Sequence, residues 1–183
     1  MSIKVLVPIS TGFEEIETTT IVDVLRRGGI NVVLAGVTEG PIQGRSAIRV
    51  LPDCTLDEAL KDASFDALVL PGGQPNAQTL TDDSRIISLL KSMNNSNRLV
   101  AAICAAPTAL HAAGLLKNRK ATIFPECRDD IPKESYVEED VVISDGVITS
   151  RGPATAMSFS LTLIETLRGK DVADKVSAAV LAS

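Results

Sequence analysis

The chain alternates between two patterns of apolar and polar residues. Short, almost uninterrupted apolar runs are typical of strands buried on both faces of a parallel sheet. Between them lie longer runs in which apolar residues recur every three or four positions, as in amphipathic helices. The apolar runs predict strands at residues 3–9, 30–36, 67–70, 99–103, 141–144 and 147–149. The periodic runs predict helices at residues 14–27, 84–94, 106–113, 154–167 and 172–182. This succession indicates a doubly wound α/β fold.

Turn signals separate these elements, and nothing in the chain has the composition of a linker or repeats itself. Glycines mark a turn at residues 40–44, and Asp145-Gly146 between two short apolar runs predicts a β-hairpin. We therefore expect residues 1–183 to form a single domain, which is long enough to bury one compact core. Aromatic residues make up only 3% of the chain, so this core must be aliphatic.

Charge and hydropathy exclude several classes of partner. The formal net charge is −5 at pH 7, and the lysines and arginines form no stripe that would neutralise nucleic-acid phosphates. No run approaches the roughly 20 apolar residues that span a bilayer, and no leader-like segment follows Met1. We accordingly expect a cytoplasmic protein that uses neither a nucleic-acid scaffold nor a membrane.

The chain contains three cysteines, Cys54, Cys104 and Cys127, without the paired spacing of a zinc site, and a single histidine. We therefore expect no metal. In a reducing compartment all three are thiols that either pack or react. Packing is the expected role of Cys54 and Cys127, because free cysteine commonly behaves as a small apolar residue.

Cys104 directly follows the apolar run at residues 99–103 and precedes Ala105-Ala106-Pro107, which opens a helical run. A proline in the first turn suits a helix start because its missing N–H would be unpaired there. A sharp strand-to-helix turn presents its side chain at the carboxyl edge of the sheet, as in a nucleophile elbow. The helix N-terminus is expected to lower the pKa of the thiol and give a reactive thiolate. The alternative is that Cys104 is an inert, buried apolar residue.

Glu17 interrupts an apolar stripe of the first predicted helix. Phe13, Ile21, Val24 and Gly28 fall on the same side at helical spacing, and all are apolar or small. A carboxyl in such low-dielectric surroundings has a raised pKa and stays protonated, so it can donate a hydrogen bond to a thiolate. The alternative is that the carboxyl escapes to solvent at the edge of the stripe.

A glycine pair follows the predicted strand at residues 67–70, after Pro71. The N–H groups of Gly72 and Gly73 can be aimed at a developing oxyanion, together with the amide of Ala105. These three residues predict an oxyanion hole at the same edge of the sheet as the cysteine. Taken alone, Pro-Gly-Gly indicates only a turn.

Five motifs, in order, resemble the ThiJ/PfpI superfamily, specifically the branch that contains the parkinsonism-associated protein deglycase and its bacterial relatives. The resemblance covers nearly the whole chain. The motifs are Gly12-Phe-Glu-Glu-Ile-Glu17, Asp23-Val-Leu-Arg-Arg-Gly-Gly-Ile30, Val69-Leu-Pro-Gly-Gly73, Ala101-Ala-Ile-Cys-Ala-Ala-Pro107 and Thr149-Ser-Arg-Gly-Pro-Ala-Thr155. The resemblance implies a flavodoxin-like three-layer sandwich with a mostly parallel central sheet, and a homodimer.

By position, the resemblance implies that Cys104 is the nucleophilic, oxidation-sensitive cysteine and that Glu17 is its protonated, hydrogen-bonded partner. It also implies that Gly72, Gly73 and Ala105 line the oxyanion pocket. The activities of the superfamily need no cofactor. They include glyoxalase III conversion of methylglyoxal, deglycation of glyoxal adducts on proteins and nucleotides, redox sensing and the holding of unfolded proteins.

Many members of the superfamily carry a histidine before a proline near the pocket, and this chain does not. The aligned residue is Phe124, and the only histidine, His111, lies seven positions after Cys104, about two helical turns away. We expect no catalytic role for His111. Without an imidazole near the thiol, a Cys-His protease has no general base, so peptide-bond cleavage is not expected.

Two arginines are candidates for contact with an anion or substrate. Arg27 matches the superfamily pattern. Arg45 precedes Ser46, whereas relatives often show serine and then arginine, which leaves open whether Arg45 reaches the pocket.

The expected function is enzymatic: the Cys104 thiolate adds to the aldehyde of a dicarbonyl such as methylglyoxal, and Glu17 moves the proton that leads to lactate. Early adducts of such dicarbonyls on protein or nucleotide amines would react with the same two residues in the same way. The alternative is a non-enzymatic redox sensor or redox-regulated chaperone, in which peroxide converts Cys104 to a sulfinate. A third possibility is an interaction-only domain with an inert Cys104.

Overall fold

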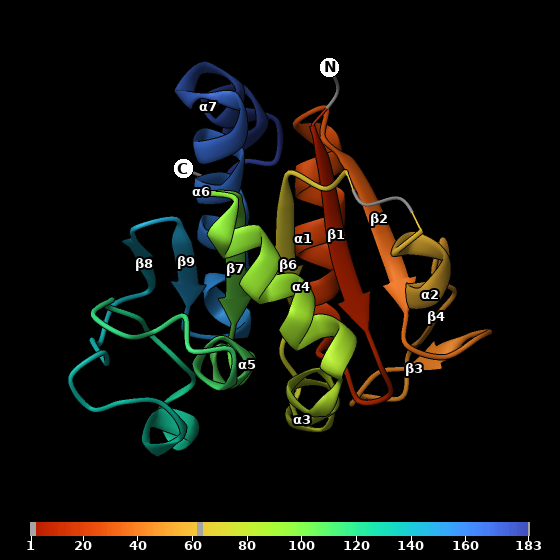
Figure 1. Ribbon diagram of the computed structural model, residues 1–183. Helices are drawn as coiled ribbons and strands as arrows, with labels where there is room; N and C mark the ends of the chain where they lie inside the picture. Colours follow the sequence, from red (N-terminus) through yellow and green to blue (C-terminus); the bar gives the residue numbers. More distant parts are fainter. Residues whose placement is uncertain (1–2, 62–63, 183) are drawn as a thin grey trace.

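The protein is described here by a computed structural model of residues 3–61 and 64–182. Its centre is a seven-stranded sheet with the strand order β5-β2-β1-β6-β7-β9-β8 (Figure 1). The strands are β1 Lys4–Ile9, β2 Asn31–Gly36, β5 Cys54–Thr55, β6 Ala67–Leu70, β7 Leu99–Ile103, β8 Val141–Ser144 and β9 Val147–Ser150. Neighbouring strands pair in parallel, except that β8 runs antiparallel to β9. The mostly parallel sheet and the hairpin at Asp145-Gly146 are confirmed.

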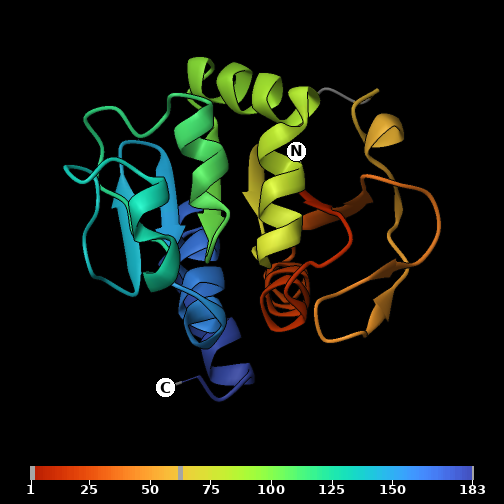
Figure 2. The same cartoon turned by 90° about the horizontal axis from the view of Figure 1, so that it is seen from below.

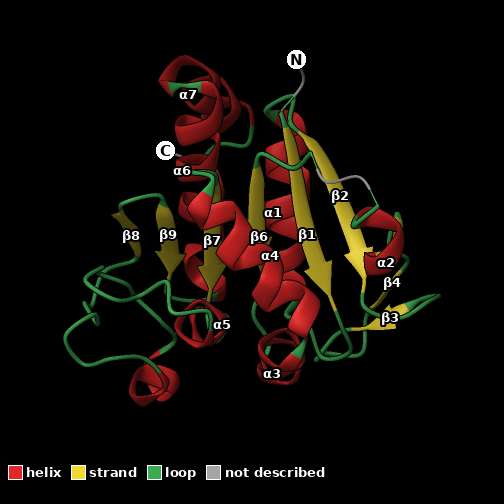
Figure 3. Ribbon diagram, in the orientation of Figure 1, coloured by secondary structure: helices red, strands yellow, loops and turns green. Residues whose placement is uncertain are grey.

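Helices cover both faces of the sheet and complete a three-layer sandwich (Figure 3). One face is covered by α1 Glu15–Arg27, α6 Ala156–Arg168 and α7 Lys170–Ala179; the other is covered by α2 Leu56–Ala59, α3 Gln74–Asp82, α4 Ser84–Asn95 and α5 Pro107–Ala112. Successive residues of β1 serve the two layers, because Val5 packs with the first group of helices and Leu6 with the second. The α/β sandwich predicted from the sequence is confirmed. No helix in the described ranges is long and apolar enough to cross a membrane.

Several short elements were not predicted. They are β5, α2, α3, the 3₁₀ helices Pro125–Asp130 and Pro153–Thr155, and a two-stranded ribbon of β3 Ile42–Gln43 and β4 Arg49–Val50. The turn predicted at residues 40–44 is wrong in part, because β3 lies within it. Two-residue strands are too short to show an alternating pattern. Helix α7 begins at Lys170 and ends at Ala179, two and three residues before the predicted limits.

The strand order places a topological switch point beside β1. The chain passes from β1 to β2 on one side, and later enters β6 on the other side of β1. Ligands of open α/β sheets bind outside the carboxyl ends of the strands at such a point. Figure 2 views the molecule from this edge, at which the parallel strands of Figure 1 end.

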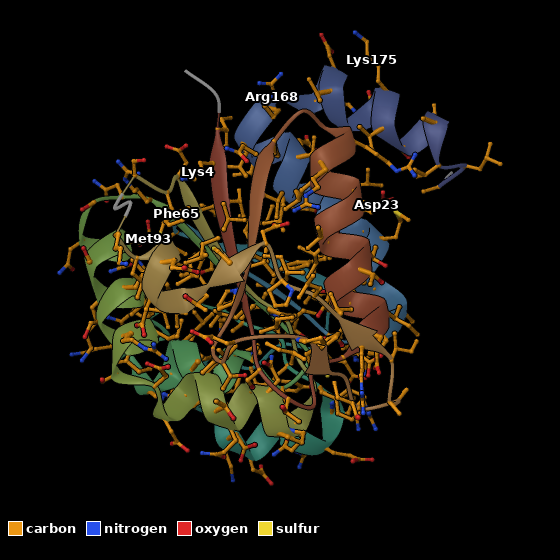
Figure 4. All side chains as sticks on the ribbon, turned by 90° about the vertical axis from the view of Figure 1, so that its right-hand side faces the viewer. Lys4, Asp23, Phe65, Met93, Arg168 and Lys175 are labelled. Carbon is orange, nitrogen blue, oxygen red and sulfur yellow. The ribbon has the colours of Figure 1, made fainter. Side chains whose placement is uncertain are left out.

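The opposite edge of the sheet is closed by contacts at the start of β1. The Lys4 ammonium lies 4.9 Å from the centroid of the Phe65 ring, and the two side chains are neighbours in Figure 4. The Lys4 backbone N–H donates to Asp66 Oδ2 at 2.9 Å. These contacts tie β1 to the segment that leads into β6.

Candidate functional site

Cys104 follows β7 in a strained backbone conformation. Its φ is +63°, in the left-handed region that residues with a Cβ rarely adopt, at a cost of about 1–3 kcal/mol. The turn is held on both sides: the Cys104 N–H donates to the Ser150 carbonyl (3.0 Å), and the Cys104 carbonyl accepts from the Phe124 N–H (2.9 Å). Cys104 therefore has the backbone of a nucleophile elbow, at the junction between strand and helix where it was predicted.

Glu17, in the first turn of α1, is fully buried at 0% exposure, which excludes the alternative in which it escapes to solvent. Its Oε2 accepts the Gly72 N–H at 2.8 Å, its Oε1 is buried without a hydrogen-bond partner, and the Cys104 thiol lies near enough to lower the pKa of the carboxyl. Burial raises the pKa of Glu17 from 4.5 to about 7, and the hydrogen bond from Gly72 and the nearby Cys104 thiol offset part of this rise. The carboxyl therefore changes its protonation state near neutral pH.

Two backbone N–H groups, those of Gly73 and Ala105, lie near the Cys104 sulfur and lower the pKa of its thiol. Both belong to the predicted oxyanion pocket. The third predicted donor, Gly72, directs its N–H to Glu17 instead. Gly72 provides space, because a Cβ at this residue would lie 2.5 Å from the Cys104 Cβ and 2.6 Å from Glu17 Oε2.

The Cys104 thiol is protonated near neutral pH. Burial, followed by the charge of an ionised Glu17, raises the pKa of Cys104 to about 12, and the N–H groups of Gly73 and Ala105 offset only part of this. The predicted lowering of this pKa by a helix N-terminus is wrong, because α5 begins three residues later, at Pro107, and has only six residues. The site thus combines a neutral thiol with a carboxyl that titrates at about pH 7.

A cavity of about 660 Å³ opens beside the sulfur. It is lined by Arg45, Gln74, Pro75, Cys104, Ala105, Phe124, Glu126, Cys127, Asp130 and Pro153. Within the described residues, no group of three or more His, Cys, Asp or Glu side chains could hold a metal ion. The cavity is large enough for a small carbonyl compound or for the end of a longer modified side chain.

The structure brings Arg45 to the cavity and leaves Arg27 away from it. The Arg45 guanidinium pairs with Glu14 (Nη1 to Oε2, 3.3 Å), and its loop is anchored where Glu15 Oε1 accepts the Ser46 N–H at 2.7 Å. Arg27 lies at the other end of α1 and pairs on the surface with Asp23 (Nε to Oδ2, 2.7 Å). Arg45 therefore lines the cavity, and Arg27 does not.

Phe124, and not the histidine of the chain, lies at the cavity. Phe124 lines the cavity and is half-buried, whereas His111 is exposed on α5 and is not among the lining residues. Glu17 is the titratable side chain that influences the pKa of the Cys104 thiol.

Sequence analysis missed most of the cavity wall. Cys127 lines the cavity beside Cys104, and its thiol donates to Gln74 Oε1 at 3.4 Å. Glu126 and Asp130 come from the same 3₁₀ helix, Pro125–Asp130. Proline in the first turn was the available signal, as Pro75 is the second residue of α3 and Pro125 begins the 3₁₀ helix.

Substituting Gly72 with alanine is expected to separate Cys104 from Glu17, because the new methyl group would overlap both. We expect a loss of about 2 kcal/mol in the free energy of unfolding, measured with urea. Gly114→Ala is the control: φ is +78° there, but nothing lies within 4 Å of the added Cβ. That variant should cost about 1 kcal/mol. Wild-type stability of Gly72→Ala would contradict this description of the site.

A model of the DJ-1/PfpI family matches residues 3–166. The Danio rerio Parkinson disease protein 7 homolog is 38% identical over 182 residues, 97% of this chain and 96% of the relative. The Caenorhabditis elegans protein named glutathione-independent glyoxalase DJR-1.2 is 40% identical over 160 residues, 86% of this chain and 84% of the relative. Some relatives are longer, and the chain spans 41% of the Arabidopsis thaliana Protein DJ-1 homolog B, at 37% identity.

Solved structures agree with the sequence comparison. Oxidised Toxoplasma gondii DJ-1 matches with a TM-score of 0.94 at 36% identity, covering 98% of each chain. Because the family model, the relatives and this structure all align with most of its length, the chain belongs to the DJ-1/PfpI family.

Proposed function

We propose that this protein is a cofactor-free, cysteine-dependent enzyme that detoxifies reactive carbonyls. It would convert methylglyoxal to lactate and remove early glyoxal adducts from proteins or nucleotides. The observation that carries the proposal is the juxtaposition of the Cys104 thiol and a buried Glu17 carboxyl with a pKa of about 7. The name of the C. elegans relative, a glutathione-independent glyoxalase, supports the choice of substrate.

The pKa of Glu17, about 7, supports its role as the base of the first step. A catalytic base works best when its pKa lies near the operating pH, and a carboxyl at about 7 meets this condition. Ionised Glu17 takes the thiol proton while the Cys104 sulfur adds to the aldehyde carbon of methylglyoxal. The resulting alkoxide is stabilised by the N–H groups of Gly73 and Ala105, which face the sulfur in the free protein. Protonation of the alkoxide gives a hemithioacetal.

Glu17 then carries a proton between two carbons of the adduct, the step that leads to lactate. The aldehyde carbon, now bonded to sulfur, loses its proton to Glu17, and the ketone oxygen takes up a proton to give an enediol. Glu17 returns its proton to the former ketone carbon while the hydroxyl on the sulfur-bound carbon loses its proton and becomes a carbonyl. This gives a lactoyl thioester on Cys104 and oxidises one carbon while reducing the other. Water hydrolyses the thioester, so that methylglyoxal and one water yield lactic acid and the free thiol. No external oxidant or reductant enters the balance.

The direct test is to incubate the purified protein with methylglyoxal in the presence of EDTA and without glutathione. Lactate should form in amounts that far exceed the protein, and the rate should rise as pH increases through about 7, because Glu17 loses its proton there. Prior alkylation of the thiols should stop the reaction. Absence of lactate above the protein-free control would contradict the proposal.

The second candidate is a redox sensor or redox-regulated chaperone. It is favoured by the two backbone N–H groups at the Cys104 sulfur, which are placed to donate hydrogen bonds to oxygen atoms that peroxide adds to the sulfur. The lactate experiment separates the two functions, because a sensor forms no lactate from methylglyoxal.

A further inference from the structure

Asn76 is a buried polar side chain of α3 with a complete set of hydrogen bonds. It is 0% exposed. Its Oδ1 accepts the Ser10 N–H (2.7 Å) and the Ser10 hydroxyl (3.0 Å). Its Nδ2 donates to the carbonyls of Pro71 (2.9 Å) and Gly72 (3.1 Å). Two acceptor sites and two donors are thus all satisfied, and the amide joins the end of β1 to the turn after β6.

The two carbonyls that Asn76 holds belong to the peptide units that serve the site. The Pro71 carbonyl shares its peptide plane with the Gly72 N–H, which donates to Glu17 Oε2. The Gly72 carbonyl shares its plane with the Gly73 N–H, which lies near the Cys104 sulfur and lowers the pKa of its thiol. A trans peptide is planar, and its C=O and N–H point in opposite directions, so fixing the oxygen fixes the direction of the N–H.

We propose that Asn76 is a positioning residue for Cys104 and Glu17, because one side-chain amide orients both peptide planes whose N–H groups serve that pair. The Glu14 N–H also donates to the Gly72 carbonyl (3.1 Å), but no backbone hydrogen bond holds the Pro71 carbonyl among those of the described turns and loops. The inference deepens the proposed function and rests on it for the chemistry of the pair. The positioning itself can be measured without a carbonyl substrate.

A purely structural role for Asn76 predicts a different result from a positioning role. If Asn76 only stabilises the fold, its loss lowers the free energy of unfolding and leaves the thiol of the folded protein unchanged. If it positions the peptide planes, the charged forms of Glu17 and Cys104 lose N–H donors. Both N–H groups lower the pKa of the residue that they contact, so both pKa values should rise.

The experiment measures iodoacetamide alkylation of Cys104 in the native protein against pH, by mass spectrometry. The variants are Asn76→Leu, which nearly keeps the volume and adds no charge, and Asn76→Ala. In either folded variant the profile should shift to higher pH, with alkylation about tenfold slower at a given pH, as expected for one lost hydrogen bond to a charged group. The matched control is Ser10→Ala, which removes one bond to the Asn76 Oδ1 and leaves both carbonyl contacts. Its stability should fall while its profile stays that of the wild type.

If the pH profile of Cys104 alkylation in a folded Asn76 variant is the same as that of the wild type, the inference is wrong. Failure of both variants to fold at low temperature also overturns it, because Asn76 would then be needed for stability itself. Failure of the wild type to form lactate is a separate result that contradicts the proposed function alone.

Discussion

Replacing Cys104 with serine is expected to reduce lactate formation from methylglyoxal by at least about 10³-fold. A hydroxyl is a much weaker acid than a thiol, and Glu17, with a pKa of about 7, is too weak a base to take its proton. Serine also forms no thioester, so the lactoyl intermediate would be replaced by a slower-reacting ester. The measurement compares lactate formed by equal amounts of purified wild type and variant.

Cys54→Ser is the matched control, since it makes the same chemical change in β5, outside the cavity. That variant should keep the wild-type rate. If Cys104→Ser forms lactate as fast as the wild type, Cys104 is not the nucleophile. If Cys54→Ser loses the activity instead, the reactive thiol is Cys54 and not Cys104.

The position of Cys104 could be predicted because strand, cysteine, small residues and proline follow one another directly in the chain. Glu17 could be predicted because a single carboxyl on an otherwise apolar helical stripe has few places to go other than the interior. Both inferences use local patterns. The parallel sheet then brings the two residues together, since its carboxyl edge collects the ends of β1, β6 and β7.

The protonation state of Cys104 could not be predicted because it depends on contacts that no local pattern encodes. A helix N-terminus suggested a thiolate, whereas burial and the charge of Glu17 raise the pKa of the thiol to about 12. The role of Asn76 was hidden for the same reason. Ser10 is distant from Asn76 in the chain, and nothing in the sequence around Gly72 marks it as a partner of Asn76. Only the fold places both residues around one amide.

Glu17→Gln is expected to lower carbonyl turnover by about 10²–10⁴-fold, the range for loss of a general acid or base. The amide keeps the shape and can still contact the thiol, but it can neither take the thiol proton nor carry a proton between the two substrate carbons. Turnover should also lose its rise through about pH 7, which belongs to this carboxyl. Steady-state lactate formation against pH measures both effects.

The same variant should make Cys104 easier to ionise. An ionised Glu17 is the second-largest cause of the raised pKa of Cys104, after burial, and glutamine carries no charge. The thiol of Glu17→Gln should therefore titrate below about 12, and alkylation above pH 7 should be faster than in the wild type. Slower turnover combined with faster alkylation cannot arise from general damage to the site. Slower alkylation would instead show that ionised Glu17 does not oppose the thiolate.

Burial of Glu17 also makes the stability of the wild type depend on pH. Its pKa is about 7 in the folded protein against an ordinary 4.5, so between these values the folded state keeps a proton that the unfolded chain has lost. The stabilising contribution of this bound proton to the free energy of unfolding is fully present below pH 4.5. It falls by about 3 kcal/mol as pH rises through 7. Urea unfolding at about pH 5 and about pH 8 should show this loss in the wild type and in the control Glu165→Gln, which changes an exposed glutamate of α6, but not in Glu17→Gln. Equal pH dependence in all three proteins would mean that the Glu17 carboxyl is as well solvated in the folded state as in the unfolded chain, and it could then not serve as a base that titrates near neutral pH.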